Sequence, residues 1–221
     1  MNRFDLSTPW GRLKAYLSFL WDDHAWLRLG FQNAHWIGTD LVRTNQPWPF
    51  QLKRWARLGV RTVINLRDEP HKAHHVLEVD ACERLGIRLV DLVIASREAP
   101  TRSQVEQAIR VFDTVEYPCL MHCKSGADRA GIMSVLYAHF RLGRPMREAA
   151  AELSLRYGHF RQGDTGVLDY VIERYLEDSD ATGEGFLDWV SRPDYDHKTV
   201  KADFKARWWG SVLTEKLLRR E

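Results

Sequence analysis

The chain has 221 residues, a net charge of +2 and an apolar content of 44%. This composition is typical of a soluble globular protein, and so small a net charge argues against a nucleic-acid partner. Three cysteines without regular spacing argue against a disulfide scaffold and favour a reducing compartment. Since no secretory segment follows Met1 and no apolar run approaches the roughly 18 residues of a spanning helix, we expect a cytoplasmic protein.

Apolar residues follow a helical rhythm near the N-terminus. Between positions 11 and 29 they recur at helical spacing, in Leu13, Tyr16, Leu17, Leu20 and Trp21. We therefore predict an amphipathic helical extension within residues 1–33. Its apolar face either packs on the domain that follows or faces a membrane or a partner.

Short apolar runs alternate with helical patterns over residues 34–178. The expected strands are 35–37, 41–42, 60–66, 87–94 and 119–121, and the expected helices are 52–58, 71–85, 101–112, 132–138, 146–155 and 168–176. Thr101 and Gln104 form a capping box, and Gly86 is a helix stop. This alternation predicts an α/β domain with a four- to five-stranded, partly parallel central sheet flanked by helices.

Three histidines, His71, His74 and His75, fall in the predicted helix 71–85. No Cys, Asp or Glu stands at a spacing that completes a closed metal site with them. We therefore interpret them as a solvated helix face and expect neither a metal nor a cofactor.

The composition changes after Asp178. Residues 180–185 are small and polar, as in a linker, and the stretch from Lys198 onward holds seven Lys or Arg against three acids. We predict a linker and a basic amphipathic tail over residues 179–221, with Phe204, Trp208, Val212, Leu213 and Leu217 on one helical face. The tail either docks on the domain or places residues 198–221 in peripheral contact with an anionic membrane.

The most informative stretch is His122-Cys-Lys-Ser-Gly-Ala-Asp-Arg-Ala-Gly131. An apolar run precedes it and another follows it, which predicts a strand, a tight loop and a buried helix. A loop that feeds a helix N-terminus aims several free N–H groups at one point and favours an anion there. With a thiol at its start and a guanidinium at its end, this loop could hold a phosphate and attack it.

This stretch resembles the signature loop of the cysteine-dependent protein tyrosine phosphatases, in particular the compact, bacterial dual-specificity-like branch. The likeness rests on Cys123-x5-Arg129, on His122 before the thiol and on Gly126 in the loop. The segment Arg43–Pro47, followed by a helix and Val63–Arg67, is similar to the opening βα unit of such enzymes.

The resemblance implies hydrolysis of phosphate monoesters through a phosphocysteine on Cys123. The phosphate would be held by the loop residues Lys124, Ser125, Gly126, Ala127, Asp128 and Arg129. A thiol at a helix N-terminus beside a guanidinium is expected as a thiolate. Arg129 would clamp two phosphate oxygens with its planar fork, which a lysine could not do. The alternative is a catalytically silent phosphate-binding module that uses the same loop.

The general acid is open among three carboxylates. Relatives carry this acid about thirty residues before the Cys, where Asp91 stands, but Asp91 falls inside a predicted strand. Glu98 lies on the loop after that strand. Asp128, directly before Arg129, resembles the loops of phosphoinositide-directed relatives.

One position departs from the family pattern. Most relatives have Ser or Thr after the signature Arg, where the hydroxyl helps the thiolate leave, but this chain has Ala130. We therefore expect slow hydrolysis of the intermediate, with Ser125 as a substitute donor. Cys82 is a candidate to protect an oxidised Cys123 through a disulfide.

The substrate class stays open at this stage. Lys124 adds a cation to the loop, as in lipid-directed relatives, and favours a phospholipid or sugar phosphate. A protein phosphorylated on Tyr, Ser or Thr is the other candidate.

Overall fold

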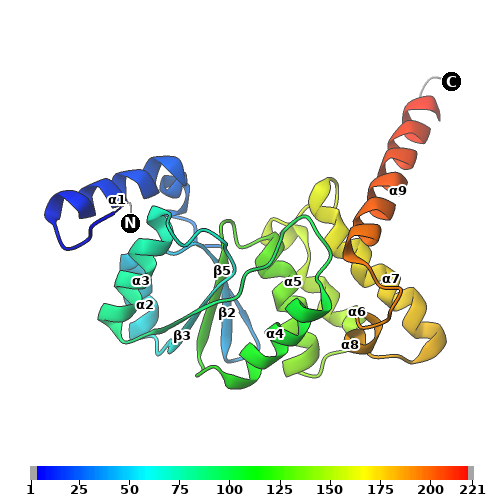
Figure 1. Ribbon diagram of the computed structural model, residues 1–221, viewed down its shortest axis with the longest axis horizontal. Helices are drawn as coiled ribbons and strands as arrows, with labels where there is room; N and C mark the ends of the chain where they lie inside the picture. Colours follow the sequence, from blue (N-terminus) through cyan, green and yellow to red (C-terminus); the bar gives the residue numbers. More distant parts are fainter. Residues whose placement is uncertain (1–3, 219–221) are drawn as a thin grey trace. The chain divides into compact units, whose positions relative to one another are not determined.

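The computed structural model describes residues 4–218, with side chains through Arg207. It divides into two compact units, Met1–Ile94 with Val111–Ala130, and Ala95–Arg110 with Gly131–Glu221. Figure 1 traces both units in chain order. The domain division drawn from the sequence, at residues 33 and 178, stays a prediction.

The first unit is built on a five-stranded sheet with the order β1-β2-β5-β3-β4. β1 (His35–Ile37) runs antiparallel to β2 (Leu41–Asn45), whereas β5 (Cys119–Cys123), β3 (Thr62–Asn65) and β4 (Arg88–Asp91) continue the sheet in parallel. The predicted α/β class and partly parallel sheet are confirmed. β3 and β4 are shorter than the strands predicted over residues 60–66 and 87–94.

Two helices cover one face of this sheet, α2 (Pro49–Arg57) and α3 (Ala73–Leu85), as Figure 1 shows. Pro49 suits the first turn of α2, and α3 stops at the predicted Gly86, which adopts a positive φ of 67°. Their inner faces and the strands form one apolar cluster, made of Val42, Leu52, Trp55, Val60, Val63, Ala81, Cys82, Ile87 and Leu120.

The N-terminal extension consists of α1 (Pro9–Asp22) and a 3-10 turn, η1 (Ala25–Arg28). The helix is shorter than predicted because His24 adopts a left-handed conformation, with a φ of 56°. α1 packs against α3 and places Phe19 on the Trp48 ring, with centroids 4.6 Å apart. One apolar face of the extension therefore packs on the first unit.

The parallel strands end at a common edge of the sheet. In register, Asn45 on β2 lies beside Cys123, and Asn65 on β3 lies beside His122. Ligand sites of open parallel sheets form outside the carboxyl ends of such strands. The signature loop leaves the sheet at this edge.

The second unit is helical. It contains most of α4 (Arg102–Thr114), which starts at the predicted capping box, with the Thr101 N–H donating to Gln104 Oε1 at 2.9 Å. α5 (Asp128–Leu136) enters it from the signature loop. The elements that follow are η2 (Tyr137–Arg141), α6 (Met146–Ala149), η3 (Ala150–Glu152), η4 (Leu155–Tyr157), η5 (Asp164–Gly166), α7 (Val167–Thr182), α8 (Phe186–Trp189) and α9 (His197–Leu218). The single helix expected over 146–155 is thus broken into short turns.

The expected linker, residues 180–185, is mostly exposed, and its first half is the end of a helix. α7 continues to Thr182 and ends at Gly183, which has a φ of 71°. Phe186 and Trp189 of α8 are buried against Tyr175, with centroids 5.1 and 5.8 Å away, because this segment supplies core aromatic rings.

The basic tail forms α9, as predicted. Its Phe204 packs on Tyr170 of α7, with centroids 5.9 Å apart, and Arg174 of α7 lies 3.4 Å from Asp203. The first turns of α9 therefore dock on α7. The side chains of Trp208, Val212, Leu213 and Leu217 lie outside the described residues. No helix in the described part of the chain is long and apolar enough to cross a membrane.

Candidate active site

The signature loop closes around the thiol of Cys123. β5 carries this side chain to the sheet edge, where it is 2% exposed, and α5 begins five residues later at Asp128. The N–H of Gly126 points at Cys123 Sγ, 3.3 Å away. A backbone donor thus faces the sulfur atom.

Four successive carbonyls of the loop point outward, to donors from other elements. Gln46 N–H donates to Lys124 O at 3.3 Å, and the Asn33 side chain donates to Ser125 O at 3.1 Å. The buried guanidinium of Arg43 donates to Gly126 O and Ala127 O at 2.9 and 3.0 Å. Because the two polar groups of a peptide point in opposite directions, this arrangement leaves the loop N–H groups for its interior, as an anion cradle requires.

The backbone conformation at position 126 and its close approach to β2 require a glycine there. Its φ is +76°, and a Cβ there would lie 2.8 Å from backbone atoms of Thr44 and Asn45. A side chain would therefore be strained and would push the loop away from β2.

His122 lies beneath the loop, fully buried, with Nε2 2.8 Å from Glu78 Oε1 on α3. Gln46 Nε2 donates to the same oxygen at 3.0 Å. These contacts join the ring of His122 to α3 and to the residue that follows β2. Glu78 is buried on α3, 44 positions before His122, and could not be recognised as its partner from the sequence.

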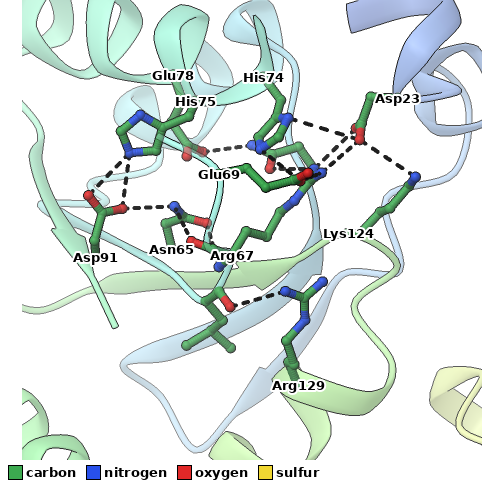
Figure 2. Close-up of polar contacts among 12 residues, drawn as sticks. Asp23, Asn65, Arg67, Glu69, His74, His75, Glu78, Asp91, Lys124 and Arg129 are labelled. Atoms are coloured by element: carbon green, nitrogen blue, oxygen red, sulfur yellow. Dashed lines mark hydrogen bonds and ion pairs between the residues drawn. The ribbon is translucent and has the colours of Figure 1, made fainter. Parts of the chain in front are cut away.

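A cavity of about 450 Å³ opens beside the loop. Arg129 and Lys124 line it from the loop, and Arg129 Nη1 also approaches Leu66 O at 3.4 Å (Figure 2). The other lining residues come from α1, from the loop after β3 and from the start of α3; they are Ser18, Phe19, Asp22, Asp23, Arg67, Asp68, Glu69, Lys72, Ala73 and His74.

Asp23, at the end of α1, is the centre of the charge network on this cavity. Its carboxylate pairs with Arg67 at 2.7 Å and with Arg28, and lies 3.6 Å from Lys124 Nζ (Figure 2). Burial opposes the charge of Asp23, but the hydrogen bond and charge of Arg67, with Arg28, outweigh it and lower the pKa of Asp23 to about 2. The N-terminal extension thus supplies a permanent anion to the rim of the signature loop.

His74 faces the same carboxylate, with Nδ1 4.0 Å from Asp23 Oδ1 and Nε2 3.6 Å from Glu69 Oε2. Burial, together with the positive charge of Arg67, lowers the pKa of His74 to about 3. His74 is therefore neutral at physiological pH.

The expectation of a solvated histidine face is wrong for His74 and His75. Both are buried, and His75 Nε2 lies 3.1 Å from Asp91 Oδ2, because α3 turns them toward carboxylates at the sheet edge. Among the described side chains, residues 4–207, no group of three His, Cys, Asp or Glu is arranged to hold a metal.

The three predicted acids are found in different surroundings. Asp128 begins α5 directly after the loop and is partly buried. Asp91 accepts from Asn65 Nδ2 at 2.8 Å and contacts His75 (Figure 2). Glu98 belongs to the second unit, where it pairs with Lys201 at 3.2 Å.

Asp68 is a fourth carboxylate, which sequence reasoning missed. It is exposed and lines the same cavity as Arg129. Its position directly after Arg67, where the predicted strand leaves the sheet edge, was the available signal.

All three cysteines are free thiols. Burial raises the pKa of Cys82 and raises that of Cys119 to about 12. Both are therefore protonated and weakly nucleophilic at neutral pH, in contrast to the role expected of Cys123.

The chain was compared with protein-family models, curated proteins and solved structures. The family model PTP-NADK, described as DSP-PTPase phosphatase fused to NAD+ kinase, matches residues 36–165. Among curated proteins, none matches the chain.

The solved structure of P. aeruginosa TpbA aligns with a TM-score of 0.53 at 19% identity, over 72% of this chain and 88% of TpbA. TpbA in complex with pTyr aligns at 0.50 and 20% identity, over 72% and 87% of the two chains. Tk-PTP in the active form aligns at 0.51 and 21% identity, over 66% and 97%. At these identities the likeness shows the fold.

Proposed function

The chain belongs to the dual-specificity-like cysteine phosphatases of bacterial type, as its sequence predicted, and we propose that it hydrolyses phosphate monoesters through a phosphocysteine on Cys123. One observation carries this proposal: four loop carbonyls are turned outward while the Gly126 N–H faces Cys123 Sγ. A structural cysteine would need no such cradle.

In the proposed first step the Cys123 thiolate attacks phosphorus, the S–P bond forms and the ester P–O bond breaks. The loop N–H groups and the Arg129 fork hold the phosphoryl oxygens while charge spreads over them. A carboxylic acid gives its proton to the leaving alkoxide. In the second step the carboxylate left by the first step takes a proton from water, the new O–P bond forms and the S–P bond breaks, which releases inorganic phosphate and restores the thiolate and the carboxylic acid.

Four carboxylates are candidates for the general acid: Asp128, Glu98, Asp91 and Asp68. Mutation of each one would identify it. Asp128 is next to Arg129 in the chain, and Asp68 shares its cavity, whereas Asp91 is engaged with His75 and Asn65. Loss of the true acid slows hydrolysis of phenyl phosphate far more than that of 4-nitrophenyl phosphate, because only the poorer leaving group needs the proton. The four Asp→Asn or Glu→Gln variants are compared by this ratio.

Two substrate classes fit a cysteine phosphatase with this cavity: a protein phosphorylated on Tyr, Ser or Thr, and a phospholipid or sugar phosphate. The complex of TpbA with pTyr favours the first by analogy. Lys124 favours the second, although Asp23 lies 3.6 Å from its ammonium group. We place the enzyme in the cytoplasm, with the 198–221 tail as a candidate peripheral membrane contact.

The test is hydrolysis of an aryl phosphate in reducing buffer with chelator present. Cys123→Ser should lower the rate by roughly 10³-fold or more, and Arg129→Lys by on the order of 10²-fold, since lysine lacks the bidentate fork. Equal rates for wild type and Cys123→Ser would refute the mechanism. Vanadate binding without any turnover would indicate the silent phosphate-binding module instead.

A further inference from the structure

Helix α1 has two apolar faces that point in opposite directions. One face, with Gly11, Ala15 and Phe19, is buried in the first unit. The other carries a stripe of exposed side chains: Trp10 (63% exposed), Leu13 (46%), Leu17 (45%) and Trp21 (65%). With about 3.6 residues per turn, these four positions fall on one side of the helix, away from the buried face.

Exposed apolar residues are concentrated in this part of the chain. Among the described residues, fifteen large apolar side chains are exposed, and eight of them lie between positions 10 and 31. The four beyond the stripe are Trp26, Leu27, Leu29 and Phe31. Single exposed apolar residues are ordinary on a protein surface, but such a concentration marks an interaction surface.

The residue types suit the interface between water and lipid. Tryptophan begins and ends the stripe, and its amphipathic ring favours the headgroup level of a bilayer, while the two leucines between them are purely apolar. Lys14, on the flank, is exposed and holds its Nζ 5.4 Å from the centre of the Trp10 ring. A cation beside an apolar stripe is typical of a helix that lies in the plane of a membrane surface.

The cations near α1 argue for lipid as the occupant of the stripe. The flank of α1 that carries Ser18 and Asp22 lines the cavity on which Arg129 opens, so one helix borders both the cavity and the stripe. Lys72 and Lys124, both exposed, also line this cavity and offer cations to an anionic headgroup.

We propose that the exposed face of α1 docks on the surface of a lipid bilayer and so brings the protein to the lipid headgroups. The docking proposal depends on the exposed stripe and does not require phosphatase activity. Its consequence, that the substrate is the phosphate monoester headgroup of a membrane lipid, rests on the proposed phosphatase function. It makes the lipid class the favoured substrate of the two left open above.

The experiment is flotation of the full chain with vesicles of phosphatidylcholine, alone and mixed with phosphatidylglycerol. Wild type should float with the mixed vesicles, and the Leu13→Asn/Leu17→Asn variant should lose affinity by roughly tenfold or more, because two apolar side chains no longer enter the interface. Brominated acyl chains should quench wild-type tryptophan fluorescence and quench a Trp10→Phe/Trp21→Phe variant much less.

The matched control is Leu58→Asn, which changes a leucine of similar exposure (58%) at the end of α2. It should float as wild type does. Absence of wild-type binding, or equal losses in the control and the stripe variant, would overturn the proposal. The proposal would also be overturned if the wild type sedimented as a dimer and the stripe variant as a monomer, since the stripe would then bind a second copy of the chain.

Soluble aryl phosphate separates this proposal from the proposed function. The stripe variant should hydrolyse it at the wild-type rate while losing activity on a lipid phosphate in vesicles. Vesicle binding without any hydrolysis would refute the phosphatase and leave the docking surface in place. Hydrolysis of the aryl phosphate without vesicle binding would refute the docking surface and leave the phosphatase function in place.

Discussion

At the scale of single residues, the charge balance of the cavity depends on Asp23. Two buried guanidiniums, Arg28 and Arg67, are held against its carboxylate, and Lys124 of the signature loop is nearby. Burial of a charge is tolerable only when a partner compensates it. A residue of the N-terminal extension therefore sets which loop cations are available to a ligand.

We predict that Asp23→Asn destabilises the protein by about 3 kcal/mol or more, because it leaves the buried guanidinium of Arg28 without its anion and leaves Arg67 only the half-exposed carboxylate of Glu69. Urea unfolding at neutral pH measures this loss. Asp22→Asn is the matched control, since Asp22 is exposed and accepts a hydrogen bond from Ser18, one helical turn earlier. The control should change stability by about 0.5 kcal/mol at most, and similar losses in both variants would contradict the assigned role of Asp23.

A second prediction concerns Ala130, which is buried at the start of α5. Without a hydroxyl there to stabilise the departing thiolate, hydrolysis of the phosphocysteine should limit turnover. Rapid-quench assays should show a burst of alcohol product close to one equivalent of enzyme, and Ala130→Ser should shrink the burst and raise the steady-state rate. A linear first turnover in the wild type would contradict this expectation.

At the scale of elements, the shape of the signature loop depends on its contact with β2. Gly126 meets the backbone of Thr44 and Asn45 at a distance that no Cβ could share, and Arg43 on the same strand holds two loop carbonyls. The strand beside the loop is thus a part of the cradle.

We predict that Gly126→Ala lowers both the stability and kcat, since it adds left-handed strain of about 1 kcal/mol and a clash that moves the loop. Gly143→Ala is a matched control: Gly143 has a similar φ of +68°, but its Cβ would meet no atom within 4 Å. In this control the left-handed strain should lower the thermal stability, while the rate of hydrolysis should stay at the wild-type value. Equal effects on hydrolysis would mean that the close approach to β2 does not shape the site.

Local signals in the sequence predicted much of this arrangement. The strand, loop and helix around Cys123, the helix stop at Gly86 and the capping box at Thr101 each depend on residues within a few positions of one another. Arg43 and Glu78 were missed because their partners are remote: Arg43 binds a carbonyl 83 positions away. A buried charge cannot be recognised in a sequence until its partner is known.

The N-terminal helix illustrates the same limit. Its apolar periodicity predicted an amphipathic helix, but α1 is apolar on two opposite sides, so periodicity alone could not say which side would be buried. Phe19 is buried because Trp48 and the start of α3 offer a complementary surface. Residues 180–185, expected as a linker, include the exposed end of α7, and the core aromatic ring of Phe186 follows them directly.

At the scale of the whole molecule, buried titratable groups tie stability to pH. His74 is enclosed by Arg67, Asp23, Glu69, His75 and His122, and burial with the nearby positive charge lowers its pKa to about 3. In the unfolded chain a histidine titrates near 6.5. The unfolded state therefore binds a proton first as the pH falls, and the native state does not.

The sign of the effect follows from this difference. The contribution of neutral His74 to stability is complete above about pH 6.5 and is lost as the pH falls toward the folded-state pKa, by up to about 1.4 kcal/mol per unit. Asp23 acts in a lower window: its lowered pKa gives stability that is present above about pH 4 and is lost only as the pH falls toward 2. Between about pH 6.5 and pH 4 the slope should therefore come from His74 rather than Asp23.

We predict that the free energy of unfolding of the wild type falls steeply from about pH 6.5 to about pH 4.5, and that His74→Gln removes up to about 1.4 kcal/mol per pH unit of this slope. Urea unfolding at several pH values, monitored by circular dichroism, measures it. The slope, not the stability at any single pH, is the readout, because glutamine also changes packing. His71→Gln is the control: His71 is exposed, so it should keep the wild-type slope. A His74→Gln slope equal to that of the wild type would show that another group takes up the proton on unfolding.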